Sequence, residues 1–298
     1  MYNIVKTQKI WFVVSGILMV VSIVFIALGG LKLGIDFTGG SKLSIRFDSR
    51  PEVTVLSAAL ETIEIGGVQV QPSGDNLVIL KTPHLDNEQK NKILEKLRTD
   101  FGTVEEQSFE SVGPTIGQEL RSKAILAIIV VLIAIIAYIS WAFRKVSSGP
   151  VSSWIYGLGA IIALFHDILI VTGLFAFLGF MFNVEIDSLF VTALLTILGF
   201  SIHDTIVVYD RIRENIKEHS SEDFSAVVNI SINQTMVRSL GTSMTALIVL
   251  LALYLFGGES LHYFMLALIA GIIVGTYSSI FIASQFLIVW RKMQHKKA

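Results

Sequence analysis

Six long apolar stretches dominate the pattern of hydrophobic and polar positions along this chain. A membrane-spanning α-helix needs about 17–25 mostly apolar residues, and each stretch is long enough. They occupy residues 10–31, 124–143, 154–178, 189–209, 240–256 and 263–290. The first is too long for the apolar core of a signal peptide, and no A-x-A cleavage pattern follows it. The pattern therefore predicts a polytopic α-helical membrane protein with six transmembrane helices.

The region between the first and second stretches has a different pattern. Residues 41–47 alternate like a strand, with Leu43, Ile45 and Phe47 on one face. Two segments with helical spacing follow at 51–63 and 85–102, the second with Asp86 as N-cap and Gly102 past its end. Strand-like runs lie at 67–71, 76–81 and 103–112. The order β-α-β-β-α-β predicts a ferredoxin-like α+β domain, a fold that by itself assigns no function.

An amphipathic segment precedes the fifth apolar stretch. Phe224, Val227, Val228 and Met236 make an apolar stripe, which predicts a helix lying on the cytoplasmic face near 221–236. The expected organisation is then a cytoplasmic N-terminus with the first helix at 1–32 and an extracytoplasmic domain at 33–123. Helices two to six occupy 124–290, and a basic cytoplasmic tail occupies 291–298.

The positions of lysine and arginine predict the orientation. Short cytoplasmic loops carry an excess of these residues, and here they flank one set of helix ends. The opposite turns, at 183–187 and 257–260, contain acidic residues and no lysine or arginine. We therefore expect both termini in the cytoplasm and residues 33–123 outside. The basic residues at the cytoplasmic ends are Lys6, Lys9, Arg144, Lys145, Arg211, Arg213, Lys217, Arg291, Lys292, Lys296 and Lys297.

Composition excludes several functions. The chain of 298 residues is 53% hydrophobic and only 16% charged, against about 25% charged residues in a typical soluble domain. A formal net charge of −1 gives no basis for nucleic-acid binding. The absence of cysteine excludes disulfides, cysteine-ligated zinc and thiol catalysis. The glycines at 34–40 are not followed by the lysine of a P-loop, so ATP binding is not supported.

One carboxylate lies deep inside the fourth apolar stretch. Asp204 at a helix centre costs roughly 2.5–3.5 kcal/mol on insertion scales, so such residues usually face a bundle interior and act on ions or protons. Arg238, at the start of the fifth stretch, is the natural countercharge, and Thr242 follows one turn later on the same face. We interpret Asp204, Arg238 and Thr242 as a proton relay. Their structural alternatives are a buried carboxylate, an interfacial arginine and a packing threonine.

Three further polar residues are candidates for an accessory relay. His166 and Asp167 lie midway along the third stretch, where they act either in proton transfer or as a hydrogen-bonded brace for the fourth helix. His203 adjoins Asp204 and so points about 100° away around the helix. We expect His203 to make an accessory polar contact. No enzyme-like catalytic group and no metal site is expected.

Seven motifs make the chain resemble the SecF family, the smaller subunits of the SecD–SecF protein-export pair, over nearly its whole length. They are GIDFTGG at 34–40, VGPTIGQEL at 112–120, ALFHD at 163–167, SIHDTIVVYDRIREN at 201–215, INQTMVRS at 232–239, LALYLFGG at 251–258 and GTYSSIFIAS at 275–284. Two positions depart from the family pattern. His203 stands where asparagine is usual, and Gln285 stands where proline is usual, a change expected to straighten the sixth helix.

The resemblance implies an architecture and a role. The family has the resistance-nodulation-division type of transporter architecture, so a SecD-like chain would supply a second six-helix half. The implied machine lies in the cytoplasmic membrane, acts after the ATP-driven push through the SecYEG channel, and has YajC as a further associate. Its external domains would grip the unfolded preprotein while the proton-motive force, rather than a bound cofactor, drives their movement.

Three other functional classes compete with this interpretation. An intramembrane aspartyl protease would use Asp167 and Asp204 as a dyad, but the G-x-G-D context of that family is missing around both. A small-molecule or lipid exporter would normally carry two halves and larger external domains in one chain. A passive assembly subunit would use its buried charges only for structure. Proton flux that depends on Asp204 separates the relay from the passive subunit.

Overall fold

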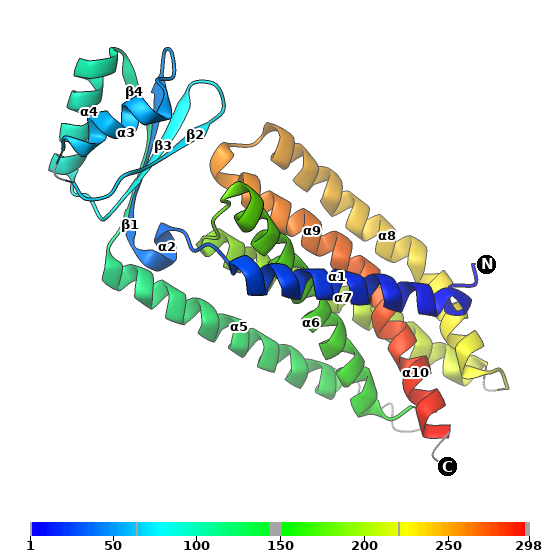
Figure 1. Ribbon diagram of the computed structural model, residues 1–298. Coiled ribbons are helices and arrows are strands. Elements are labelled where there is room, and N and C mark those ends of the chain that lie inside the picture. Colours follow the sequence, from blue (N-terminus) through cyan, green and yellow to red (C-terminus); the bar gives the residue numbers. More distant parts are fainter. Residues whose placement is uncertain (1, 64, 143–150, 220, 296–298) are drawn as a thin grey trace. The chain divides into compact units, whose positions relative to one another are not determined.

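The computed structural model describes residues 2–63, 65–142, 151–219 and 221–295. The chain forms two compact units, one of Leu33–Leu126 and one of Met1–Lys32 with Ala127–Ala298. Each unit is described by itself, with the elements labelled as in Figure 1. Arg144, Lys145, Lys296 and Lys297, which contribute to the predicted orientation, lie outside the described residues.

The smaller unit is an α+β domain with one antiparallel sheet. Its strands follow the order β2-β3-β1-β4, with β1 paired to both β3 and β4. Both longer helices, α3 and α4, lie on the same face of this sheet (Figure 1). The predicted β-α-β-β-α-β order is therefore confirmed. The elements are α2 Ile35–Thr38, β1 Gly40–Phe47, α3 Val53–Glu61, β2 Gln69–Ser73, β3 Leu77–Thr82, α4 Asn87–Phe101 and β4 Val104–Val112.

The core of this domain follows from the alternation in β1. Leu43, Ile45 and Phe47 are all at most 2% exposed and pack under the two helices, as the sequence predicts. Helix α4 begins with a capping box, in which the Asp86 side chain accepts from the Gln89 backbone and the Gln89 side chain accepts from the Asp86 backbone. The domain thus has a closed apolar core and a locally specified helix start.

A pair of glycines starts β1 at a crowded point. Gly39 has φ +74°, and a Cβ there would lie 2.8 Å from the Cα of Pro114. Gly40 has φ +132°, and its Cβ would lie 2.8 Å from the Thr82 carbonyl oxygen. Only glycine combines these backbone angles with so little space. The glycines therefore allow close backbone packing at the start of β1.

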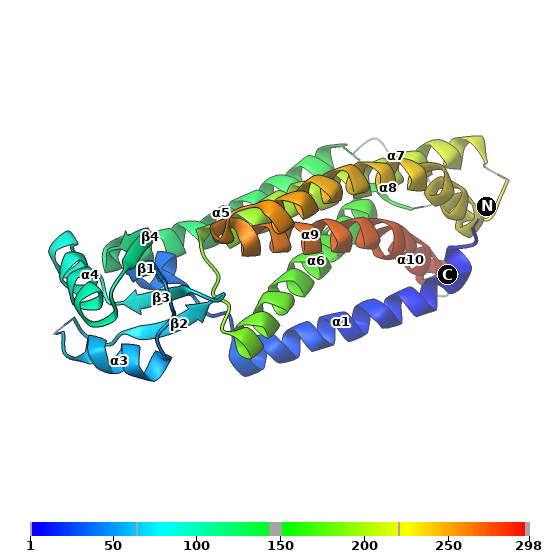
Figure 2. The ribbon, with the colours of Figure 1, turned by 90° about the horizontal axis from the view of Figure 1, so that it is seen from above.

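The larger unit consists of long helices. The described residues contain six helices long and apolar enough to cross a membrane, as predicted. Figure 2 shows them from above, with α6, α7 and α9 packed together and α1 lying along α6. Their bounds are α1 Gln8–Gly29, α5 Pro114–Ala142, α6 Ser153–Phe182, α7 Ser188–Glu218, α8 Phe224–Phe256, α9 His262–Ser278 and α10 Ser284–His295, with short 3-10 turns at Val5–Thr7 and Glu259–Leu261 and a π-helical turn at Ser279–Ala283.

Three differences from the predicted boundaries change the organisation of the helices, beyond shifts such as the longer end of α7 at Glu218. Helix α5 starts at Pro114, well before the predicted position 124, because proline suits a first helical turn even where polar residues follow. The segment predicted as a separate interfacial helix is the first half of α8, which runs for 33 residues without a break. Residues 291–295, predicted as tail, belong to α10. The sixth span thus runs from α9 into α10 through the π-helical turn.

Burial divides the spanning helices into two groups. Half of the most apolar stretch of α6 and of α7 is buried (50% each), and 61% of the sixth span is buried, but only 11% of α1 and of α8 and 6% of α5 are. Large apolar side chains cover the exposed faces, including Ile17 on α1, Ile133 on α5 and Ile248 on α8. The inner helices therefore form the core, and the outer ones present apolar faces.

Candidate functional site

Asp204 lies in the middle of α7 and is only 2% exposed. The hydroxyls of Ser239 on α8 and Thr276 on α9 are the polar neighbours that act on its carboxyl group. Within the described residues, however, Asp204 Oδ2 and Ser239 Oγ are buried without a hydrogen-bond partner. Thr276 Oγ1 bonds instead to Ser243 Oγ at 2.6 Å. A buried carboxyl with unused bonding capacity thus lies where three helices meet.

The predicted pairing of Asp204 with Arg238 does not form within this chain. Arg238 is exposed, and in the part of the chain that the structure describes it makes no ion pair. Thr242 shares its face as predicted, but is also exposed and donates to the Arg238 carbonyl at 3.0 Å. The next residue, Ser239, faces Asp204 because consecutive helical positions differ by about 100°. Arg238 therefore lies on the face of α8 next to the one that meets Asp204, and the expected pair is not formed.

His203 occupies the position predicted for it. The ring is exposed while Asp204 is buried, so the two neighbours point to different sides of α7. The imidazole is still close enough to act electrostatically on the Asp204 carboxyl. His203 is thus a surface neighbour of the site and does not line its buried part.

His166 and Asp167 form a second polar cluster, in which both ring nitrogens and both carboxyl oxygens have a hydrogen-bond partner. His166 Nδ1 lies 2.9 Å from Asp167 Oδ1, and both side chains are buried. Asp167 Oδ2 accepts from Ser201 of α7 at 2.5 Å and from Ser278 of α9 at 2.8 Å. His166 Nε2 lies 3.1 Å from Ser15 Oγ of α1. The cluster therefore joins four helices through one carboxyl and one imidazole.

The directions of these hydrogen bonds fix where protons lie. Tyr277 donates to the Trp11 carbonyl at 3.0 Å, so its oxygen accepts from Ser15, 3.0 Å away. Because the Ser15 hydroxyl donates its hydrogen to Tyr277, its oxygen can only accept from His166. The donor in that hydrogen bond is therefore His166 Nε2, which carries a hydrogen. The contact between His166 Nδ1 and Asp167 Oδ1 is a hydrogen bond only if one of these two atoms carries a hydrogen. The two side chains therefore share one proton, which lies on Nδ1 or on Oδ1. The pair is therefore neutral overall, whichever atom holds it.

Small residues bring α7 and α9 close enough to build both clusters. A Cβ at Gly271 would lie 2.1 Å from Ile197, and one at Gly275 would lie 2.9 Å from the Ser201 Cβ. Small residues four apart allow membrane helices to approach closely. Beyond them, Thr205 Oγ1 and Ser279 Oγ meet at 2.8 Å, at the start of the π-helical turn. Turns of this kind are frequent at functional sites.

The hydroxyl groups that surround the two carboxyls were not predicted from the sequence. Ser15, Ser201, Ser239, Thr276 and Ser278 are each at most 6% exposed. Their signal in the sequence was weak, because serine and threonine in membrane helices are common packing residues. The run GTYSS at 275–279, with Gly271 one turn before it, was the available indication. The described residues contain no group of histidine and acidic side chains that could hold a metal ion.

Comparison with known proteins identifies the family. Residues 91–293 match the family "Protein export membrane protein SecD/SecF, C-terminal", and residues 24–49 match the "SecD/SecF GG Motif", which includes Gly39 and Gly40. The chain is 44% identical to protein translocase subunit SecF of Thermobaculum terrenum, with 97% of this chain and 94% of that one covered. It is 36% identical to the SecF subunit of Haemophilus influenzae, with 93% and 82% covered.

Solved structures agree with this result. The fold matches a crystal structure of SecDF, a translocon-associated membrane protein, with a TM-score of 0.84 and 35% identity over 98% of this chain. A second SecDF structure, in a super-membrane-facing form, matches with a TM-score of 0.71 and 34% identity over 99% of this chain. This chain spans only 39% of each SecDF chain. The protein is thus a multi-pass membrane protein of the protein-export class. The chain belongs to the SecD/SecF family, as a SecF-type subunit that assists Sec-dependent export.

Proposed function

We propose that this SecF-type chain couples proton movement at Asp204 to a late step of preprotein translocation. The observation that carries the proposal is the contrast between its two buried aspartates. Asp167 shares a proton with His166 and has all its contacts filled. Asp204 has a buried oxygen with no hydrogen-bond partner, and in the described part of the chain it forms no ion pair with a lysine or an arginine. An uncompensated intramembrane carboxyl is suited to bind and release a proton.

The second cluster serves best as a brace. Its hydrogen bonds join α1, α6, α7 and α9, and moving its proton would require breaking several of them together. Asp167 and Asp204 share no hydrogen bond among the described residues, which argues against an aspartyl protease dyad. His166 and Asp167 then hold α7 in place, while Asp204 on the same helix carries the charge that changes.

The exposed face of α8 supports a SecD-like six-helix partner. Arg238 and Thr242 lie on this face together with Val249 and Phe256, all exposed. An arginine facing lipid alone is costly, so a second helical unit should cover it. The SecDF chains are much longer than this one, which leaves room for such a half. The SecYEG channel, YajC and an unfolded preprotein complete the proposed set of partners.

The orientation is part of the same proposal. Basic residues lie at the start of the first span, near the end of α7 and near the end of α10, and these helix ends lie at the same side of the helical unit (Figure 2). They are Lys6, Lys9, Arg213, Lys217 and Lys292. By the positive-inside rule, that side faces the cytoplasm, and the α+β unit lies outside the cytoplasmic membrane. A proton reaching Asp204 from outside would then move down the proton-motive force as it crosses.

The driving force is large enough for one titrating carboxyl to matter. One elementary charge crossing 100 mV yields about 2.3 kcal/mol, and one pH unit adds about 1.4 kcal/mol. Together these approach the roughly 5.5 kcal/mol that moves a two-state equilibrium from 1:99 to 99:1. A few protons per cycle can therefore drive a conformational change of the whole assembly.

The test replaces Asp204 with asparagine, which keeps the size and a hydrogen-bond acceptor but removes the titratable charge. Preprotein transport into inverted membrane vesicles is measured with ATP throughout, with and without a proton-motive force. We expect Asp204→Asn to abolish the stimulation by the proton-motive force while the chain and its partner are present at normal levels.

The matched control is Asp210→Asn on the same helix. Asp210 forms an ion pair with Arg213 at 2.6 Å, and both side chains are substantially exposed, so its loss should change transport little. If Asp204→Asn responds to the proton-motive force like the wild type, Asp204 is a structural carboxyl. The chain would then be a passive assembly subunit.

A further inference from the structure

A cavity of about 550 Å³ opens between the N-terminal segment, the first turns of α8 and the end of α10. The described residues that line it include three lysines, Lys6, Lys9 and Lys292, and no acidic side chain. Within the described residues none of the three ammonium groups forms an ion pair. A cavity surrounded by three uncompensated positive charges is suited to an anion.

The walls of this cavity are fixed by hydrogen bonds to the N-terminal segment. Asn229 Oδ1 accepts from the Ile4 backbone at 2.9 Å, and Asn233 Oδ1 accepts from the Tyr2 backbone at 2.8 Å. Both asparagine amides donate back to the Tyr2 carbonyl, at 3.1 and 2.8 Å. Gln285 of α10 donates to the Ile4 carbonyl at 3.5 Å. The segment that carries Lys6 is thus held against two helices.

The third wall is held by a cation–π contact. The Arg291 guanidinium lies 4.9 Å from the ring centroid of Phe224, the first residue of α8. This contact ties the end of α10, with Lys292, to the first turn of α8, where Ser225 lines the cavity. The lysines therefore stand around a preformed space, although their own side chains remain exposed.

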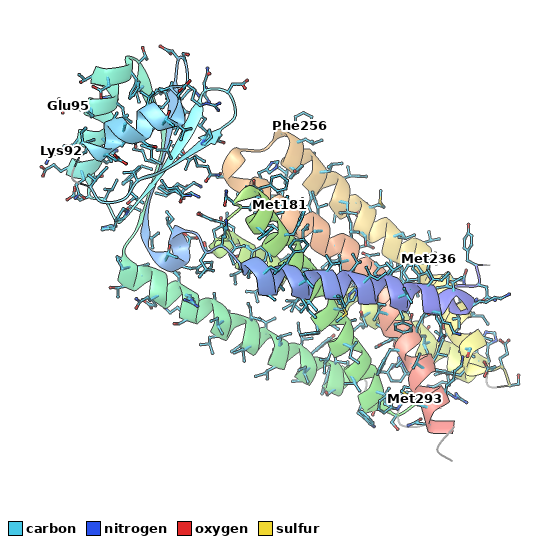
Figure 3. The ribbon with its side chains drawn as sticks, viewed as in Figure 1. Lys92, Glu95, Met181, Met236, Phe256 and Met293 are labelled. Atoms are coloured by element: carbon cyan, nitrogen blue, oxygen red, sulfur yellow. The ribbon has the colours of Figure 1, made fainter. Side chains whose placement is uncertain are left out.

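The place of the cavity in the fold indicates which anion it takes. Lys6 and Lys9 lie at the start of the first span, and Lys292 lies near the end of the sixth. These ends lie together at one side of the helical unit (Figure 2), and Met293 in Figure 3 marks the end of α10. Val5 and Ile230 add apolar surface to the lining. Basic pockets at the ends of membrane helices bind anionic headgroups.

We propose that this cavity binds the phosphate of an anionic phospholipid headgroup, with the acyl chains passing over Val5 and Ile230. The lipid would connect the N-terminal segment, α8 and α10, and so stabilise the helix that carries Arg238. This site is separate from Asp204 and goes beyond the proposed proton coupling.

The experiment uses the purified full chain and counts bound lipids by native mass spectrometry during titration with phosphatidylglycerol or phosphatidylcholine. We expect a phosphatidylglycerol adduct that survives where phosphatidylcholine is lost. Each lysine near an anionic surface changes affinity about 5-fold, so single substitutions should weaken binding about 5-fold and the triple variant K6Q/K9Q/K292Q about 100-fold. The matched control K92Q/K96Q/K217Q removes the same charge elsewhere on the surface and should bind like the wild type.

Three outcomes would overturn the proposal. The triple variant could retain phosphatidylglycerol like the wild type, or the control could lose it equally, which would show that only net charge matters. Soluble glycerol phosphate at the same concentration could also displace the lipid, which would make this a site for a free phosphate compound. Melting curves of both triple variants should match the wild type in detergent without anionic lipid, since the substituted side chains lie at the surface and the ion pairs of Lys92 and Lys96 are surface pairs within one helix, which contribute little to stability.

Discussion

The two units of this chain distribute polar and apolar side chains in opposite ways. The α+β unit buries a compact apolar core and places charged side chains outside, as Lys92 and Glu95 on the outer face of α4 show (Figure 3). The helical unit exposes isoleucine, valine and leucine on its outer helices and buries a histidine, two aspartates and many hydroxyls. The difference reflects the two solvents, because water solvates the charges and lipid solvates the apolar side chains.

This comparison shows where function should be sought in each unit. Buried polar groups in a water-soluble domain are usually paired, and the α+β unit follows this rule, with Ser41 bonded to Ser111 at 2.7 Å. In the helical unit several buried polar atoms have no hydrogen-bond partner among the described residues, and one of them, Asp204 Oδ2, belongs to a carboxyl group. Because a carboxyl group can take up and release a proton, whereas an amide, an indole or a hydroxyl does not do so near neutral pH, Asp204 is the group suited to change state.

The largest effect should come from separating the two units. A fragment of residues 40–112 contains the whole sheet, both helices and the closed core, so it should fold in water. We expect a cooperative thermal transition and mixed α/β circular dichroism. The same chain without 40–112 should aggregate unless detergent is present, because its outer faces are apolar. If the fragment remains disordered in water, the α+β unit is not an independently folding, water-soluble domain and the proposed difference between the two units is wrong.

A smaller effect should follow from replacing one leucine with alanine in each unit. Leu80 is 0% exposed in the α+β core, so Leu80→Ala should lower the free energy of unfolding of the fragment by about 2–5 kcal/mol in urea titration. Leu251 is 49% exposed on α8, so Leu251→Ala should change the stability of the detergent-purified chain by at most about 0.5 kcal/mol. Equal losses would mean that α8 is already packed against another part of the chain.

The smallest effect expected is that of Asp167→Asn, with Asp167→Ala as the disruptive reference. Asp167→Ala leaves His166, Ser201 and Ser278 without their partner, a loss of about 1–3 kcal/mol for each buried group left unpaired. In Asp167→Asn the amide can donate to His166 Nδ1 while its oxygen accepts from both serines. The asparagine variant should therefore melt close to the wild type in detergent. If asparagine is as destabilising as alanine, the pair is an ionic contact and not a shared-proton contact with a neutral ring.

The sequence by itself determined the elements and most of the α+β unit. Six apolar stretches gave the six spans, and the alternation of Leu43, Ile45 and Phe47 gave the buried face of β1. These features were predictable because hydrophobic period and local capping act over a few residues. The position of Asp204 in an apolar helix was enough to single it out, and the motifs were enough to indicate the family.

Only the tertiary structure decided which polar groups meet. The sequence places Arg238 and Thr242 one turn apart, but it cannot show that Ser239, one position along, is the residue that faces Asp204. It also could not join Ser15 to His166 across 151 positions, or reveal that α8 continues unbroken from the amphipathic segment. Rotation of each helix about its axis and the close approach at Gly271 and Gly275 fix these contacts. Both depend on the packing of whole helices, which no local pattern specifies.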